Sequence, residues 1–272
     1  MQKIEFIKMH GLGNDFVIID RRKNNVKINK DIIHKLSDRR TGAGCDQVIT
    51  IDKNISSDYD ARIQIFNPNG DSAEACGNGT RCVAKLLFDE KNITNLKLQS
   101  LAGILNAQKI NNEIISVNMG RLSHHWEDIP LTREVDTLNM PIELENFTSG
   151  VAINVGNPHI VFFGKKINLF DLNRFGPKIE NHELFPEKTN VEIVEVVNRK
   201  VIIMKVWERG AGITLACGSG ACAAVYASIL KGVTDNDVEV KLAKGSLQVK
   251  IKNNEAIMMG PAKESFRGYI EI

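Results

Sequence analysis

Two cysteines stand at the beginning of matching apolar segments. Cys76 opens C-G-N-G, followed by T-R-C-V-A-K-L-L-F, and Cys217 opens C-G-S-G, followed by A-C-A-A-V-Y-A-S-I-L. Each apolar segment predicts a buried helix, so each thiol would lie where unpaired N–H groups and the positive end of the helix dipole converge. Such a position lowers the pKa of a thiol toward neutrality. We therefore predict that both thiols give and take protons.

The residues after each cysteine predict an anion site. Glycines let a ligand come close to the backbone, and N–H groups at a helix start bind carboxylates. We expect a substrate carboxylate to rest against the residues that follow the two thiols: Gly77, Asn78, Gly218 and Ser219.

Two thiols around one carboxylate suit the inversion of a stereocentre. A base on one face of the α-carbon removes the proton while an acid on the other face returns one, and the roles exchange in the reverse reaction. The N–H groups around the carboxylate would stabilise the carbanion-like charge. A cleft that closes between two lobes would exclude water.

The polar residues before the two cysteines repeat at matching distances. Asn14 precedes Cys76 by 62 residues, and Asn157 precedes Cys217 by 60. Two further pairs keep similar spacings, first 29 and 27 residues and then nine residues before each cysteine: Gln47 with Asn190, and Asn67 with Glu208. The chain therefore contains an internal duplication.

The duplication and the period-two alternation predict an α+β fold with two homologous lobes, each a mostly antiparallel β-sheet wrapped around a central apolar helix. The first lobe should cover residues 1–120, with a C-terminal strand at 263–272 returning to it, and the second 121–262. Residues 121–150 are polar, without clear period, and should form the crossover. The active site should lie in the cleft between the lobes.

The composition limits the classes of partner. A net charge of +2 with scattered basic residues gives no argument for nucleic acid or a membrane surface. The N-terminus carries no uninterrupted apolar run of a signal peptide, and five cysteines, an odd number, favour a reducing compartment, so we expect a cytoplasmic location. The spacings C-x5-C and C-x4-C differ from those of structural zinc sites. We therefore expect no metal and no cofactor.

The signature segments resemble those of a known family. N-P-N-G-D-S-A-E-A-C-G-N-G-T-R-C and E-R-G-A-G-I-T-L-A-C-G-S-G-A-C-A are similar to the two motifs of diaminopimelate epimerases, and H-G-L-G-N-D-F and V-G-N-P-H match as well. The resemblance runs from about residue 3 to the end. It implies a homodimeric enzyme, independent of pyridoxal phosphate. Its reaction would be the interconversion of LL- and meso-2,6-diaminopimelate in the synthesis of lysine and peptidoglycan precursors.

The resemblance also implies roles for single residues. Cys76 and Cys217 would be the acid/base thiols, with Cys76 donating and Cys217 accepting the proton in the LL-to-meso direction, and His159 and Glu208 would assist them. The substrate would be held by residues from both copies: Asn14, Gln47, Asn67, Gly77, Asn78, Asn157, Asn190, Glu208, Arg209, Gly218 and Ser219. Arg209 can pair with the distal carboxylate by two hydrogen bonds, and the amides can orient both polar groups there.

Some positions depart from the family pattern, and other interpretations stay open. Ile213 stands where many members have Glu, Pro68 and Asn69 replace a common Ala-Asp, and Cys45 lies at a variable place. The alternatives are a racemase of another amino acid, such as proline racemase, a metal-dependent isomerase, and a non-catalytic binding protein for a diamino acid. The other cysteines, Cys82 and Cys222, are expected to be inert core residues.

Overall fold

The structure is a computed structural model, and it describes residues 3–24, 26–74 and 76–271. The chain divides into two compact units, Met1–Val117 with Gly260–Ile272 and Asn118–Met259. From the sequence we expected the chain to pass from the first lobe to the second after residue 120 and to return after residue 262.

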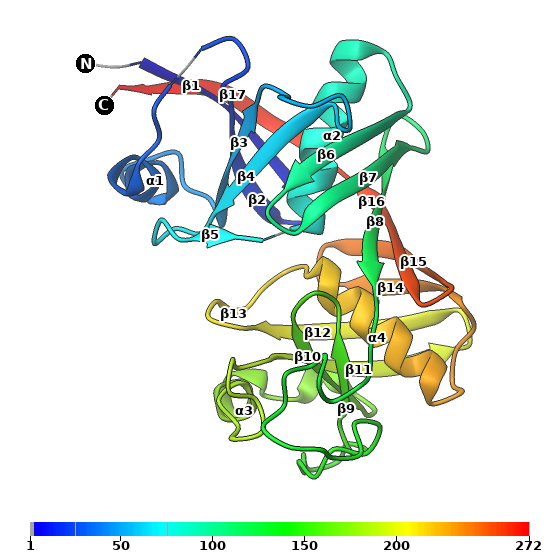
Figure 1. Ribbon diagram of the computed structural model, residues 1–272. Coiled ribbons are helices and arrows are strands. Elements are labelled where there is room, and N and C mark those ends of the chain that lie inside the picture. Colours follow the sequence, from blue (N-terminus) through cyan, green and yellow to red (C-terminus); the bar gives the residue numbers. More distant parts are fainter. Residues whose placement is uncertain (1–2, 25, 75, 272) are drawn as a thin grey trace. The chain divides into compact units, whose positions relative to one another are not determined.

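The first unit is built from the N-terminal strands, the helices between them and the last strand of the chain (Figure 1). Its elements in chain order are β1 (Lys3–Gly11), β2 (Asn14–Asp20), α1 (Lys30–Ser37), β3 (Gln47–Asp52), β4 (Ala61–Phe66), β5 (Ser72–Ala73), α2 (Gly77–Lys91), β6 (Asn95–Ser100), β7 (Gly103–Lys109), the first part of β8 (Ile114–Arg121), and finally β17 (Lys263–Glu271).

The strands of the first unit pair in an order that follows the chain closely. β1 is antiparallel to β2, β2 is parallel to β3, β3 is antiparallel to β4, β4 is parallel to β6, and β6, β7 and β8 are antiparallel neighbours. The last strand, β17, runs antiparallel to β1, so both ends of the chain lie in this unit (Figure 1).

The second unit repeats the series of elements. They are the end of β8, then β9 (Val151–Asn154), β10 (Pro158–Phe163), η1 (Ile167–Leu169), α3 (Leu172–Glu180), β11 (Asn190–Asn198), β12 (Val201–Glu208), β13 (Gly212–Ile213), α4 (Gly218–Leu230), β14 (Asp237–Leu242), β15 (Gly245–Lys252) and most of β16 (Glu255–Pro261).

The two units share one topology, which explains the repeated sequence motifs. β9 is antiparallel to β10, β10 is parallel to β11, β11 is antiparallel to β12, β12 is parallel to β14, and β15 follows antiparallel. The register is also repeated. Phe16 faces Gln47 across the parallel pair β2–β3, and His159 faces Asn190 across β10–β11. The duplication therefore extends to single positions.

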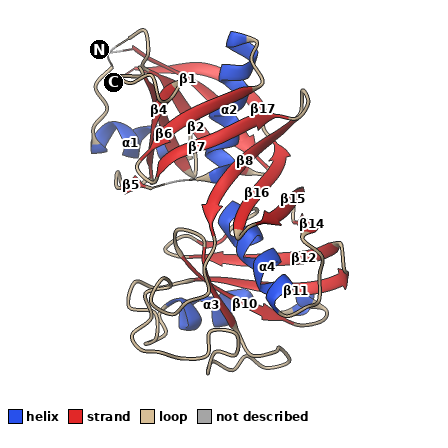
Figure 2. Cartoon of the chain, turned by 45° about the vertical axis from the view of Figure 1, so that its right-hand side comes forward, coloured by secondary structure: helices blue, strands red, loops and turns tan. Residues whose placement is uncertain are grey.

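In each unit the sheet wraps around the helix that follows the C-G-x-G motif. α2 contacts β1 and β2 and also β6 and β7, which lie in distant parts of the strand order (Figure 2). α4 packs in the same way against β9, β10, β14 and β15. Residues on all faces of α4 are buried, as a helix inside its own sheet requires. The predicted fold class is therefore confirmed for both units.

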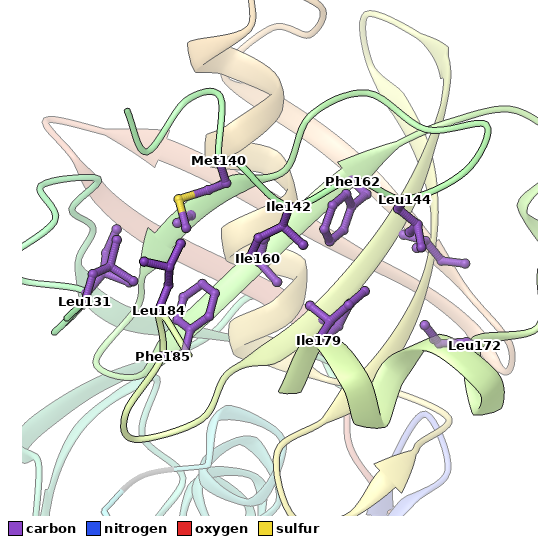
Figure 3. Close-up of a cluster of buried hydrophobic side chains, with 14 of the residues drawn as sticks. Leu131, Met140, Ile142, Leu144, Ile160, Phe162, Leu172, Ile179, Leu184 and Phe185 are labelled. Carbon is purple, nitrogen blue, oxygen red and sulfur yellow. The ribbon is translucent and has the colours of Figure 1, made fainter. Parts of the chain in front are cut away.

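The segment 121–150 differs from its expected role as a polar crossover. It contributes buried apolar side chains to a core of the second unit, where they pack with residues of β10 and α3 (Figure 3). These side chains come from irregular chain: Ile129, Leu131, Met140, Ile142 and Leu144. These residues do not recur at helical or strand spacing, so the sequence pattern did not predict that they are buried.

Among the described residues, no helix is long and apolar enough to cross a membrane.

Candidate functional site

Cys76 lies at the start of α2, as the sequence predicted. It is the N-cap residue with extended backbone (φ −147°, ψ 107°), and its carbonyl accepts hydrogen bonds from Thr80 N and Thr80 Oγ1. Its side chain is partly buried, and Sγ lies 3.9 Å from Asn14 Oδ1, to which it donates. The first helical turn holds Gly77 and Asn78, both buried. This thiol therefore stands beside the N–H groups expected to bind an anion.

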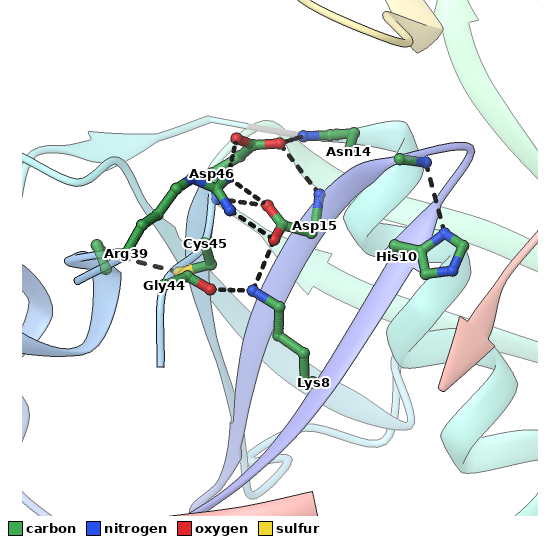
Figure 4. Close-up of polar contacts among 10 residues, drawn as sticks. Lys8, His10, Asn14, Asp15, Arg39, Gly44, Cys45 and Asp46 are labelled. Carbon is green, nitrogen blue, oxygen red and sulfur yellow. Dashed lines mark hydrogen bonds and ion pairs between the residues drawn. The ribbon is translucent and has the colours of Figure 1, made fainter. Parts of the chain in front are cut away.

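Asn14 connects Cys76 with the rest of the first half-site. It begins β2, and Asn78 Nδ2 donates to its Oδ1 over 3.0 Å. The Asn14 amide nitrogen donates to Asp46 Oδ2 over 2.8 Å (Figure 4). Both sides of this amide are thus engaged, with the oxygen shared between Asn78 and the thiol.

Gln47 and Asn67 lie together at the ends of neighbouring strands. Gln47 begins β3 and Asn67 follows β4, and Gln47 Nε2 donates to Asn67 Oδ1 over 2.9 Å. Gln47 Oε1 is buried and has no hydrogen-bond partner in the described structure. A buried acceptor without a partner costs free energy, so this oxygen is a candidate contact for a bound donor.

A cluster of charged residues that the sequence analysis missed lies next to Asn14 (Figure 4). Lys8 is buried, donates to the carbonyl of Gly44, and pairs with Asp15 at 2.7 Å. Arg39 pairs with both Asp15 (2.8 Å) and Asp46 (2.7 Å). Burial alone would raise the pKa of Asp15, but hydrogen bonds and charges of Arg39 and Lys8 lower it to about 2.

Cys217 occupies the equivalent place in the second unit. It is the N-cap of α4 (φ −124°, ψ 119°), and its sulfur accepts from Gly220 N at 3.4 Å. Ser219 Oγ lies 3.5 Å from the sulfur. Unlike Cys76, the Cys217 side chain is buried, with 4% of its surface exposed.

The surroundings of Cys217 correct the expectation of a lowered thiol pKa. Burial raises the pKa of Cys217 well above its usual value, and the charges of Glu208 and Glu192 raise it further. Hydrogen bonds from Ser219 and Gly220 oppose this rise without cancelling it. In this structure, desolvation and two carboxylates raise the pKa of the thiol by more than its position at a helix start lowers it.

Glu208 is the carboxylate next to this thiol. It ends β12 and accepts a hydrogen bond from Thr214 Oγ1. Burial raises the pKa of Glu208, although hydrogen bonds from Thr214 and Cys217 lower it. Burial therefore shifts the pKa of the thiol and that of the carboxyl group in the same direction, upward.

His159 is fully buried between two polar partners. Its Nδ1 lies 2.8 Å from Glu192 Oε1, and its Nε2 lies 2.9 Å from Asn157 Oδ1. Glu192 is also fully buried, and its Oε2 has no partner in the described structure. The sequence analysis named His159 and Asn157 and missed Glu192. Glu192 lies in a strand whose sequence, N-V-E-I-V-E-V-V-N, has the ordinary mixture of apolar and polar residues of a strand.

Asn190 and Arg209 are joined through the backbone. Asn190 is buried; its Oδ1 accepts from Arg209 N (2.9 Å) and its Nδ2 donates to Pro158 O (2.9 Å). The Arg209 guanidinium donates to Glu187 O over 2.9 Å. Asn190 therefore ties the starts of β10 and β11 to the turn that carries Arg209.

The structure places the predicted site residues in two groups. In the first unit it brings together Cys76, Asn78 and Asn14, with Gln47 and Asn67 as a second pair. In the second unit it gathers Cys217, Ser219 and Glu208 around one helix start, His159 with Asn157, and Asn190 with Arg209. Ile213, a departure from the family pattern, is exposed.

The remaining cysteines are buried. Cys82 and Cys222 are fully buried inside α2 and α4, and burial raises the pKa of Cys82 to about 12. Cys45 is also buried, and burial raises its pKa. These features agree with inert core thiols.

Solved structures share this duplicated fold. A phenazine biosynthesis protein of the PhzF family from Bacillus anthracis superposes with a TM-score of 0.71, at 16% identity, over 100% of both chains. A hydroxyproline epimerase from Agrobacterium vitis gives a TM-score of 0.70, at 13% identity, covering 98% of this chain and 92% of that one. The chain therefore has the fold of the PhzF, proline racemase and diaminopimelate epimerase class.

Sequence comparison defines the family within this class. The diaminopimelate epimerase family model matches residues 6–125 and 151–264. The diaminopimelate epimerase of Pelagibacter ubique is 45% identical over 267 residues, 96% of both chains. That of Zymomonas mobilis is 42% identical over 265 residues, covering 97% of this chain and 96% of the relative. The chain belongs to the diaminopimelate epimerase family and is an isomerase.

Proposed function

We propose that this chain interconverts LL- and meso-2,6-diaminopimelate without a cofactor, with Cys76 and Cys217 as the two proton-transferring groups. The observation that carries the proposal is the equivalence of the two thiols. Each is the N-cap of the helix that its own sheet surrounds, and each is followed by glycine and a polar residue. A duplicated fold with one thiol at a helix start in each copy provides the acid and the base that inversion needs.

The reaction sets a geometric requirement on the two units. Both thiols must reach the same α-carbon from opposite faces, so both helix starts must act on one substrate. The backbone N–H groups after each thiol would then bind the α-carboxylate and stabilise its developing charge: Gly77, Asn78, Gly218 and Ser219.

We propose that the polar groups outside the thiol sites bind the far end of the substrate. Diaminopimelate carries a second ammonium and a second carboxylate. The partnerless Oε1 of Gln47 suits an ammonium donor, and the guanidinium of Arg209 suits a carboxylate. Asn67 and Asn157 would complete the polar lining. An amino acid without the second charged end would leave such groups unpaired, which penalises it.

The second thiol needs its partners to act as a base. Burial and the charges of Glu208 and Glu192 keep the Cys217 proton on sulfur in the substrate-free protein, because they raise its pKa. A substrate ammonium beside the thiol would add a positive charge and favour the thiolate. We propose that Cys217 accepts and Cys76 donates the proton in the LL-to-meso direction, and that His159 and Glu208 assist them.

The proposal also covers location and assembly. We propose a cytoplasmic location, because an odd number of cysteines, five, favours a reducing compartment. A homodimer is proposed from the family resemblance.

A substrate panel tests the proposed function. Freshly reduced protein is incubated separately with LL-diaminopimelate, L-proline and L-lysine, each with and without a chelator, and the stereochemistry of the product is measured. We expect conversion of LL-diaminopimelate alone, unchanged by the chelator. Racemisation of proline with no conversion of diaminopimelate would overturn the assignment, and loss of activity with the chelator would favour a metal-dependent isomerase.

A further inference from the structure

Four polar side chains of the first unit form a continuous chain that passes through Asn14. The guanidinium of Arg81 is fully buried, and its Nη2 donates to Asn78 Oδ1 over 2.8 Å. Asn78 Nδ2 then donates to Asn14 Oδ1 over 3.0 Å, and Asn14 Nδ2 donates to Asp46 Oδ2 over 2.8 Å. We call this series of three hydrogen bonds the Arg81–Asp46 relay.

The two ends of the relay fix the direction of both amides inside it. A guanidinium has only donors, so Asn78 must present its oxygen to Arg81 and its NH₂ group to Asn14. A carboxylate has only acceptors, so Asn14 must present its NH₂ group to Asp46. Reversing Asn14 would set its oxygen against the Asp46 carboxylate and its NH₂ group against that of Asn78. Both hydrogen bonds would become repulsive contacts.

Asp46 is itself held firmly in place. Its Oδ2 also accepts from Asp15 N (3.1 Å), and its Oδ1 accepts from Arg39 Nη2 (2.7 Å) (Figure 4). Its own backbone N–H donates to Asp15. Three donors around one carboxylate fix its orientation. The acceptor end of the relay is therefore preorganised before any substrate binds.

The fixed orientation of Asn14 determines which end of its amide faces the Cys76 sulfur. With its NH₂ group committed to Asp46, Asn14 turns its Oδ1 toward the sulfur, at 3.9 Å. An acceptor there receives the S–H bond, whereas an NH₂ group would donate to a thiolate. The relay thus selects the protonated form of the thiol at this position.

We propose that Asp46 is a positioning residue for the first catalytic thiol, acting through Asn14 in the Arg81–Asp46 relay to keep Cys76 as a proton donor. The inference rests on the proposed function and deepens it, since it assigns a means of separating the roles of the two thiols. The hydrogen-bond connection between Asp46 and the thiol runs through the Asn14 amide.

The test compares the pH dependence of Cys76 alkylation in substrate-free protein. Iodoacetamide labelling is followed peptide by peptide by mass spectrometry in the wild type, Asp46→Asn and Asp15→Asn. Asparagine at 46 offers either an oxygen or an NH₂ group, so Asn14 loses the carboxylate that holds its NH₂ group, and only the NH₂ group of Asn78 still opposes its turning. Asp15→Asn is the matched control, because it removes a carboxylate charge from the same cluster without cutting the bond to Asn14.

The relay predicts that the alkylation midpoint of Cys76 falls in Asp46→Asn by about one pH unit more than in Asp15→Asn, since the charge effect is shared by both variants. Equal shifts in the two variants, or none in Asp46→Asn, would overturn the proposal. Thermal melting checks that both variants are folded.

A charge-conserving exchange keeps the proposal testable if Asp46→Asn does not fold. In the double variant Asn14→Asp with Asp46→Asn, the amide at 46 donates to the carboxylate at 14, which still faces the sulfur with an acceptor. We expect its Cys76 midpoint at or above that of the wild type, and a midpoint below it would contradict the relay. Neither measurement uses a substrate, so a failure of the diaminopimelate assignment would not change what they say about the relay.

Discussion

The imidazole of His159 and the carboxylate of Glu192 lie 2.8 Å apart, from Nδ1 to Oε1, and both side chains are fully buried. Asn157 Oδ1 lies 2.9 Å from the other ring nitrogen. A hydrogen bond to Nδ1 fixes the orientation of an imidazole and the role left to its second nitrogen. Glu192 therefore fixes the orientation of the His159 ring and the role of its second nitrogen.

The Glu192→Gln variant tests this relationship. Glutamine keeps the shape and removes the charge, and the loss of a hydrogen bond to a charged group costs about 1.5–3 kcal/mol. We expect kcat/KM for diaminopimelate to fall about 10–100-fold, measured by conversion of the LL to the meso form. The control is Glu195→Gln on the same strand, where the carboxylate accepts from Ile167 N. Equal losses in both variants would count against a specific role for Glu192.

The raised pKa of Cys217 gives a prediction for its reactivity. Burial and the charges of Glu208 and Glu192 favour the thiol, so alkylation of Cys217 should reach its midpoint only above the usual value of 9.0. Glu208→Gln removes one repelling charge and should move this midpoint to lower pH. Peptide-resolved labelling between about pH 6 and pH 11 measures it, and Cys45 in the other unit should show no change. A midpoint below about 8.5 in the wild type would contradict the burial argument.

The partnerless oxygen of Gln47 predicts a binding defect. Gln47→Leu removes the acceptor and retains much of the side-chain volume. If the oxygen binds a substrate ammonium, KM should rise about tenfold or more with a smaller change in kcat, because a hydrogen bond to a charged group is lost. Gln64→Leu on the neighbouring strand β4 is the control. An unchanged KM in Gln47→Leu would remove Gln47 from the binding set.

The charged cluster around Asp15 predicts an acid dependence of stability. Its folded-state pKa of about 2 lies below the unfolded value of about 3.9, so the pairing stabilises the fold above about pH 4 and is lost as pH falls toward 2. Allowing for partial exposure, we expect Asp15→Asn to lower the free energy of unfolding at pH 7 by about 1–2 kcal/mol. Urea unfolding at about pH 7 and pH 3 measures this. A variant that loses as much stability to acid as the wild type would contradict the assignment.

The duplicated parts of the molecule are those that the sequence could predict. The C-G-x-G motifs, the apolar helices and the asparagines before them recur at nearly constant spacing, because both copies use one topology and one register. Cys76 and Cys217 are therefore at helix starts, as predicted. The family resemblance adds the reaction, which no spacing alone could have supplied.

The residues that the sequence analysis missed occur in one copy without a counterpart of the same type. Glu192 and Asp46 lie among ordinary strand and loop residues, and only the fold brings them to His159 and Asn14. The pKa of Cys217 was predicted in the wrong direction for a related reason. Sequence position reveals the helix dipole, whereas burial and the approach of Glu208 and Glu192 depend on tertiary packing.

The central claim is that two thiols move the proton, and isotope exchange tests it most directly. Reduced protein is incubated with LL-diaminopimelate in deuterated water, and deuterium at the α-carbon is followed together with conversion to the meso form. The wild type should incorporate deuterium as it epimerises, and Cys76→Ala and Cys217→Ala should each lose conversion by at least about 100–10,000-fold, the usual contribution of a general acid or base. Epimerisation that survives removal of either thiol, or that proceeds without solvent exchange in the wild type, would contradict the two-thiol mechanism.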